Sequence, residues 1–134
     1  MPKTTPRTNA LNTLQKLVRI KAADDQGFCS CVTCGVTRQW NEGMQGGHFI
    51  AKGKGGTNEE NVHPQCAACN GFRMRYGNAE ASYTLYMVDM YGREQVDLMI
   101  DRNRVTKYSK QDLIDLTTEW KQQINYHLKR IGQA

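Results

Sequence analysis

The 134-residue chain has no long run of apolar residues. A helix that spans a membrane needs roughly 20 consecutive apolar residues, so the sequence predicts no membrane-spanning segment. Residues 1–7 also lack the apolar stretch of a secretory signal. We therefore expect a cytoplasmic location, where cysteines stay reduced and disulfides are rare.

Acidic residues are absent from residues 1–21, although this segment contains five Lys and Arg residues. The formal net charge of the whole chain is +5, and its pI is about 9.0. Basic residues elsewhere also come in short clusters. A surface with such clusters is what binding to a nucleic-acid backbone requires, whereas any single cluster is equally compatible with an ordinary solvated surface.

Four of the 5 cysteines form two C-x-x-C pairs, Cys31 with Cys34 and Cys66 with Cys69. Four thiolates at this spacing are typical of a tetrahedral Zn²⁺ site, so we predict a structural zinc ion that joins the two ends of the intervening segment. Such a site would lower the net charge to about +3. The alternatives are disulfides or buried free thiols. We expect Cys29 to be a small buried side chain outside the zinc site.

The sequence predicts a single domain over residues 9–134, after a disordered basic arm over residues 1–8. Asn9 is a candidate N-cap for a first helix over residues 10–23. Short strands are expected around residues 38–40 and over residues 45–51.

Helices dominate the second half of the chain. The second cysteine pair is expected to open a helix over residues 67–75. Later helices are expected over residues 79–91, 93–101 and 109–131. The last helix begins with Ser109 as N-cap and Asp112 in a capping box. Its apolar stripe, which includes Trp120, could pack on this domain's own core or on a second subunit.

The order of motifs along residues 10–100 resembles the HNH, or ββα-metal, nucleases. Within that group, residues 45–49 (QGGHF), residues 58–66 (NEENVHPQC) and Cys69-Asn70 with the following Gly77-Asn78 resemble the phage NinG family, called Rap in lambdoid phages. Residues 66–70 are also similar to endonuclease VII, a zinc-framed phage resolvase of Holliday junctions.

The resemblance implies an α+β fold with a zinc-stabilised, treble-clef-like ββα-metal core over about residues 28–78. An N-terminal helix would precede this core, and a helical extension over about residues 79–131 would follow it. The implied activity is structure-specific endonuclease cleavage of branched recombination intermediates, such as Holliday junctions and D-loops, in the host-cell cytoplasm.

The resemblance also implies a role for each of three polar residues. His48 would be the general base that takes a proton from the attacking water, because a histidine titrates near neutral pH. Asn61 would hold the loop that follows His48 in register. The carbonyl oxygen of Asn70 would bind a catalytic Mg²⁺ or Mn²⁺.

Gly47 departs from the family pattern, because many HNH enzymes have at this position an aspartate that binds the metal. Hard cations favour at least one carboxylate, so a further ligand is expected to complete the site. The candidates are Glu42, His63, Glu59 and Glu60. A structural, hydrogen-bonded histidine is the alternative for His63, and His127 is expected to be structural or on the surface.

DNA contacts are expected from Lys52 and Lys54, in a glycine-flanked loop, and from Arg73 and Arg75, after the second cysteine pair. These side chains would bind phosphates without reading base sequence. Symmetric cutting of a four-way junction needs two active sites, so a homodimer through the Trp120 helix is expected for that substrate.

Two other functions are compatible with the sequence. A non-catalytic zinc module that binds DNA or a recombination partner would explain the cysteines and the basic surface. A restriction-type or homing-type nuclease would read base edges, but residues 79–131 show no recognisable motif for that purpose.

Overall fold

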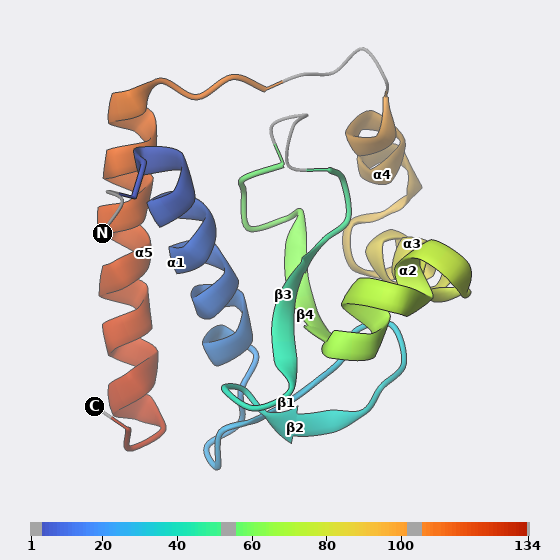
Figure 1. Ribbon diagram of the computed structural model, residues 1–134, viewed down its shortest axis with the longest axis horizontal. Helices are drawn as coiled ribbons and strands as arrows, with labels where there is room; N and C mark the ends of the chain where they lie inside the picture. The colour runs from blue at the N-terminus through green and yellow to red at the C-terminus, as the bar shows by residue number, and fades with distance from the viewer. Residues whose placement is uncertain (1–3, 52–55, 102–105, 134) are drawn as a thin grey trace.

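The computed structural model describes residues 4–51, 56–101 and 106–133, and it has an α+β fold with two small antiparallel sheets (Figure 1). The α-helices are α1 (Pro6–Lys21), α2 (Met74–Tyr76), α3 (Ala79–Tyr91), α4 (Arg93–Ile100) and α5 (Lys110–Arg130). The strands are β1 (Phe28–Ser30), β2 (Thr37–Gln39), β3 (Met44–His48) and β4 (Val62–Cys66). A π-helical turn, Cys69–Arg73, leads directly into α2. In the part of the chain that the structure describes, no helix is long and apolar enough to cross a membrane.

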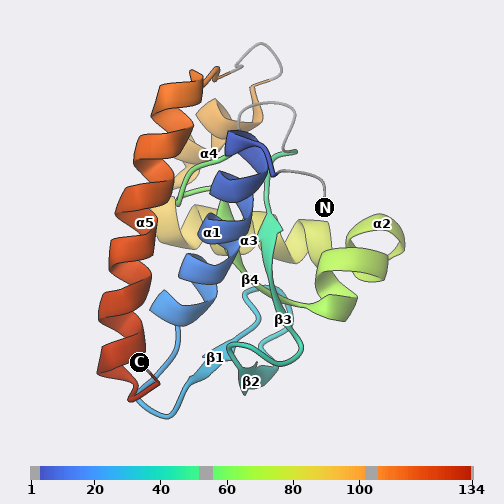
Figure 2. The same cartoon turned by 60° about the vertical axis from the view of Figure 1, so that its left-hand side comes forward.

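Helices α1 and α5 lie side by side and run in the same direction (Figures 1 and 2). Both contribute to one apolar core, to which α1 gives Leu14 and Leu17 and α5 gives Trp120 and Ile124. The apolar stripe of α5 therefore covers the core of its own domain. Burial of these side chains, rather than intrinsic helix propensity, is the main stabilising term for such a helix pair.

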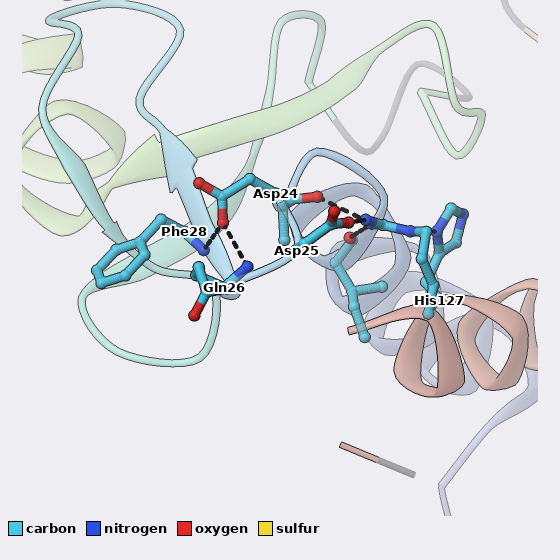
Figure 3. Close-up of polar contacts among 8 residues, drawn as sticks. Asp24, Asp25, Gln26, Phe28 and His127 are labelled. Atoms are coloured by element: carbon cyan, nitrogen blue, oxygen red, sulfur yellow. Dashed lines mark hydrogen bonds and ion pairs between the residues drawn. The ribbon is translucent and has the colours of Figure 1, made fainter. Parts of the chain in front are cut away.

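The C-terminal ends of α1 and α5 are joined by the side chain of Arg130. Its guanidinium donates hydrogen bonds to the carbonyl oxygens of Ile20 and Ala23 and forms an ion pair with Asp25 at 3.3 Å. Arg130 Nε also donates to His127 Nδ1. Figure 3 shows His127 near Asp25 of the loop that follows α1. A cation at the last carbonyls of a helix satisfies unpaired acceptors and interacts favourably with the helix dipole.

The first helix begins earlier than the sequence predicted. Thr5 is its N-cap, and the Thr5 side chain accepts a hydrogen bond from the amide of Thr8 at 3.1 Å. Pro6 occupies the first helical position, which suits its fixed φ and its missing N–H. The prediction of Asn9 as N-cap was thus wrong, and residues 6–8 belong to the helix. At α5 the predicted capping box of Ser109 and Asp112 is confirmed.

The β3–β4 hairpin lies between α1 and α3 (Figure 1). On one face, a Cβ added at Gly46 would collide with Gln15 of α1. On the other face, the Tyr83 hydroxyl of α3 donates a hydrogen bond to the Gly47 carbonyl at 2.7 Å. Every residue of β4 is buried, because both faces of the hairpin are covered.

Candidate metal centre and polar site

The four predicted zinc ligands, Cys31, Cys34, Cys66 and Cys69, come together in one cluster. Their sulfur atoms all lie within 4.8 Å of one another, and the sulfurs of Cys34 and Cys66 are 3.8 Å apart. A tetrahedral zinc ion with Zn–S bonds of about 2.3 Å separates its sulfurs by a similar distance. Cys29 is buried outside this cluster. The donor atoms and their spacing therefore fit a structural zinc ion.

The Cys31 sulfur is prepared for metal binding by its local hydrogen bonds. Burial acts against its ionisation, but the Thr33 hydroxyl and nearby backbone amides outweigh that effect and lower the pKa of Cys31 to about 6. The Thr33 Oγ1 atom lies 3.1 Å from this sulfur. Since a thiolate can only accept, Thr33 must donate its proton to Cys31 in the ionised state. Burial raises the pKa of Cys66 to about 11, so zinc binding has to displace the proton of that thiol.

Thr33 also connects the cysteine cluster to Gln65, a fully buried residue of β4. The amide nitrogen of Gln65 lies 3.5 Å from Thr33 Oγ1, which is free to accept once its own proton points at Cys31. This contact directs the other end of the carboxamide, Oε1, away from the cysteines. Among the described residues, Gln65 Oε1 accepts no hydrogen bond.

Gln65 Oε1 occupies the space beside Gly47 in which a larger residue would place its side chain. A Cβ added at Gly47 would overlap Gln65 Oε1 and would lie 2.9 Å from Asn70 Oδ1. Glycine is therefore required at position 47 as long as Gln65 keeps this conformation. An aspartate at this position, as the HNH pattern has it, would require the Gln65 side chain to move.

Asn70 faces the same point from the π-helical turn. Its amide nitrogen donates to Gln45 Oε1 at 2.8 Å, which directs its Oδ1 toward Gly47. The structure thus brings together three carboxamide side chains, those of Gln45, Gln65 and Asn70, around Gly47. Neither Gln45 nor Gln65 was among the site residues predicted from the sequence, because a glutamine next to a zinc ligand carries no distinctive signal.

Asn61 is almost fully buried and has the geometry of a positioning residue. Its side chain accepts from the amide of Ile50 at 2.7 Å and donates to the carbonyl oxygens of Ile50 and Gly56, each at 2.9 Å. A Cβ at Gly56 would lie 2.3 Å from the Asn61 amide nitrogen, so this close approach requires glycine. Asn61 therefore ties both ends of the loop after β3 to the start of β4.

His48 is the last residue of β3 and pairs with Val62 of β4. Because successive strand residues alternate between faces, His48 shares the α1 side of the hairpin with Gly46, whereas Gly47 faces Asn70. His48 and Asn70 therefore flank the Gly47 backbone from opposite faces, at the end of a strand whose outer edge pairs with no other described strand.

His63 lies among aromatic rings. The rings of Tyr83, Tyr86 and Tyr91 surround it, with centroid distances between 5.1 and 6.1 Å. Its Nε2 atom is 2.8 Å from the carbonyl oxygen of Glu60, so this nitrogen carries the hydrogen. Burial is the main cause that lowers the pKa of His63. This geometry favours the structural alternative for His63.

Two of the three candidate carboxylates have partners elsewhere in the structure. Glu59 forms an ion pair with Lys21 at 3.1 Å and accepts a hydrogen bond from Trp120, and Glu60 accepts one from Gln95. Glu42 is exposed in the turn before β3. Across the described ranges, the four cysteines form the sole group of three or more potential His, Cys, Asp or Glu ligands.

Of the predicted DNA-contacting residues, Arg73 and Arg75 are exposed on the segment that follows Asn70. Arg73 also approaches the zinc site, because its Nη1 atom lies 3.6 Å from the Cys69 sulfur. The predictions for Lys52 and Lys54 fall outside the described residues.

Two hollows of the surface lie away from this polar site. One of about 420 Å³ lies between α5 and the segment before β4 and is lined by Glu59 and Trp120. Another of about 1000 Å³ is lined by His63, Tyr86 and Tyr91. Neither is lined by Gly47 or Asn70.

Comparison with known families supports the relationship suggested by these motifs. The family described as bacteriophage lambda NinG protein matches residues 3–130, which is nearly the whole chain. Neither a curated protein nor a solved structure gives a significant match. Since the match includes both cysteine pairs, the hairpin and all of α5, this chain belongs to the bacteriophage lambda NinG family.

Proposed function

We propose that this chain is a metal-dependent DNA endonuclease of the HNH type that acts on branched recombination intermediates. The observation that carries the proposal is the order β3, β4 and helical turn. His48, Asn61 and Asn70 lie on or between these elements, and the resemblance to the HNH motif assigns its three positions to them. The chain belongs to the bacteriophage lambda NinG family, and the recombination role that the resemblance implies for this family supports this substrate class.

In this proposal His48 accepts a proton from the water that attacks the scissile phosphate. Such a base must lie within hydrogen-bond reach of the water and have a pKa near the working pH, which suits a half-buried histidine at a strand end. Asn61 acts as a positioning residue, because it fixes the backbone at Ile50, two residues after His48. A shift of about 1 Å in the base can cost roughly 100-fold in rate, so this bracing matters for catalysis.

The cation of this proposal would be held by the carboxamide oxygens of Asn70 and Gln65, which both face the space beside Gly47. Carbonyl oxygens are hard ligands that fit Mg²⁺ or Mn²⁺, and the buried Oε1 of Gln65 has no other partner among the described residues. Because no carboxylate contributes, phosphate oxygens of the DNA would complete the site. The bound cation would supply neutralisation of negative charge on the phosphate and on the leaving oxygen.

DNA affinity would come from Arg73 and Arg75, which are next to Asn70 along the chain. Guanidinium groups match phosphate oxygens and do not read bases through such contacts, so substrate choice would depend on DNA shape. Cutting both strands of a four-way junction would require two copies of the chain. Light scattering of the protein alone and with a junction tests this expected homodimer.

Cleavage assays on the zinc-loaded protein test the nuclease directly. A four-way junction, a displacement loop and linear duplex are compared in Mg²⁺, Mn²⁺ or EDTA. We expect metal-dependent cutting that favours branched DNA and that falls about 100- to 10,000-fold in His48→Ala. The matched control is His127→Gln in α5, which should cut at the wild-type rate. Equal cutting by His48→Ala, with zinc content unchanged, would show that His48 is not the base.

A non-catalytic zinc module is the second candidate function. Gly47 at the position of the motif aspartate favours it, because sites for Mg²⁺ usually contain a carboxylate. Binding of branched DNA without cutting in every metal would support this module. Cutting of linear duplex at defined sequences would instead indicate a restriction-type or homing-type nuclease.

A further inference from the structure

The segment from Cys69 to Tyr76 exposes two large aromatic side chains to solvent. Phe72 is 70% exposed and Tyr76 is 73% exposed. Their rings lie 5.2 Å apart, centroid to centroid, with an angle of 47° between the ring planes. Single exposed apolar residues are common, but a paired aromatic surface of this size is a feature that marks interaction sites.

The packing of Met74 explains why these two side chains point outward. Met74 lies between them in sequence and packs against both hydrophobic clusters of the protein. Residues 72 and 76 are one helical turn apart, so they share a face that Met74 does not. Figure 2 shows α2 projecting from the body of the molecule on the side opposite α5. Because Met74 anchors the segment to the core, the aromatic pair points away from the core.

The charge around the pair selects an anionic partner. Residues 69–76 contain no acidic residue, and the exposed Arg73 and Arg75 alternate with the aromatic positions. A partner that fits this surface offers flat rings for stacking and negative charge beside them. Nucleic acid with unpaired bases has both, whereas the bases of a continuous duplex are already stacked on each other.

We propose that Phe72 and Tyr76 form a stacking platform for unpaired bases, with Arg73 and Arg75 binding the flanking phosphates. This inference rests on the proposed function in taking DNA as the ligand, and it names the feature of the DNA that is recognised. Asn70 lies two residues before the platform in the same turn. Nucleotides stacked on the platform therefore lie close to the polar site. This arrangement gives the protein a preference for branch points and single-stranded gaps.

Fluorescence anisotropy with zinc-loaded, full-length protein tests this proposal. The probes are a labelled oligo(dT) of about 12 nucleotides and a blunt duplex. The double variant Phe72→Ala/Tyr76→Ala should bind the single strand about 10- to 100-fold more weakly and the duplex within about twofold of wild type. The matched control is Tyr126→Ala, which removes a 65% exposed aromatic side chain from α5 and should change neither affinity. Zinc content and circular dichroism verify folding.

A second pair of variants separates stacking from other kinds of contact. Phe72→Leu/Tyr76→Leu keeps apolar area but removes the ring faces, so it should lose single-strand affinity as the alanine variant does. Retained affinity in the leucine variant would overturn stacking. Arg73→Ala/Arg75→Ala should weaken binding of single strand and duplex alike and reduce the salt dependence of both. An equal loss on both probes in the alanine variant of the aromatic pair would also overturn the platform.

The outcomes for the platform and for the nuclease are distinguishable. Single-strand binding that depends on the aromatic pair, without cleavage in any metal, would support the platform and contradict the nuclease. Cleavage of branched DNA that is unchanged in Phe72→Ala/Tyr76→Ala, with single-strand affinity also unchanged, would support the nuclease and overturn the platform. A wild-type protein that binds neither probe but cuts branched DNA would overturn the platform alone.

Discussion

The two long helices and the segment between them are stabilised in different ways. Helices α1 and α5 bury apolar side chains such as Leu14, Leu17 and Trp120 against each other and the hairpin. The described part of residues 28–76 contains no strand longer than 5 residues and brings together the four cysteines. The helical pair is an ordinary apolar core, whereas this cysteine-framed segment contains buried polar contacts and four cysteines placed to bind a metal ion.

This difference shows which part of the structure contains the buried polar side chains. Asn61 and Gln65 are buried at 1% and 0% exposure, in the segment that also carries His48 and Asn70. Buried amides are costly unless their hydrogen bonds are satisfied, so such side chains need a framework that fixes them. The metal centre fixes the segment from one side and the helical pair supports it from the other.

The largest expected effect comes from removing the zinc. Chelation, or Cys69→Ala, should abolish protection from hydrogen exchange in residues 28–76, because structural zinc sites contribute on the order of 10 kcal/mol to folding. The contact between α1 and α5 should retain measurable protection. Cys29→Ala is the matched control, since Cys29 is buried outside the metal cluster and should leave one zinc bound per chain. Equal loss of protection in residues 28–76 and in the α1–α5 pair would contradict the claim that the two regions are stabilised in different ways.

The next largest effect is expected in the helical core, at Trp120. This side chain is 2% exposed and donates a hydrogen bond to Glu59 at 3.2 Å. Trp120→Ala should lower the free energy of unfolding by about 3–5 kcal/mol, because it leaves a cavity in the helical core. Zinc content measured under native conditions should stay at one ion per chain. Tyr126→Ala on the exposed side of the same helix should change stability by less than about 0.5 kcal/mol in the same urea titration. A small effect of Trp120→Ala would contradict the assignment of the core.

A smaller effect is expected where Gly47 meets Gln65. Gly47→Ala should destabilise the protein by about 1–3 kcal/mol, because the added Cβ overlaps Gln65 Oε1. Gln65→Ala opens that space, so the double variant should lose less stability than the sum of the two single variants. Urea unfolding of all four proteins measures this coupling. Additive losses would show that the two side chains do not compete for this space.

The smallest expected effect is a pH dependence at His63. Its pKa is lowered in the folded state, chiefly by burial, so the unfolded chain binds the proton more readily. The contribution of His63 to stability is therefore complete above its unfolded value of about 6.5 and is lost as the pH falls from there through the lowered pKa. His63→Gln should flatten this part of the curve of unfolding free energy against pH. Zinc content is measured in parallel, because protonation of the cysteines also lowers the stability as the pH falls. An unchanged slope in His63→Gln would contradict the assignment.

The sequence predicted the parts of the fold that carry strong local signals. The cysteine spacing located the metal centre, and the Ser109 capping box located the start of α5. The β4 strand was not predicted, because it contains Pro64 and two polar residues and is buried on both faces, so it has no alternating pattern. The strand β1 was also missed, since three residues are too few for a pattern.

The polar site was predicted only in part because its members meet through tertiary contacts. Asn61 and Asn70 were found by motif, but the approach of Gln65 to Gly47 depends on the register of β3 and β4. Likewise, the structural interpretation of His63 depends on the tyrosines of α3 that surround it, which the sequence does not reveal. A sequence pattern gives the order of chemical groups along the chain, and the packing decides which of them share a site.

The pairing of α1 with α5 has a consequence for how the protein is made. These helices lie near opposite ends of the described chain, and Arg130 contacts Ile20 and Ala23 across more than 100 residues. During synthesis the apolar face of α1 leaves the ribosome long before its partner exists. Contacts so distant in sequence also slow folding, because a long loop must close before they form. The apolar face of α1 therefore stays exposed on the nascent chain until α5 has been translated. We expect chaperones to bind Leu14 and Leu17 during that interval.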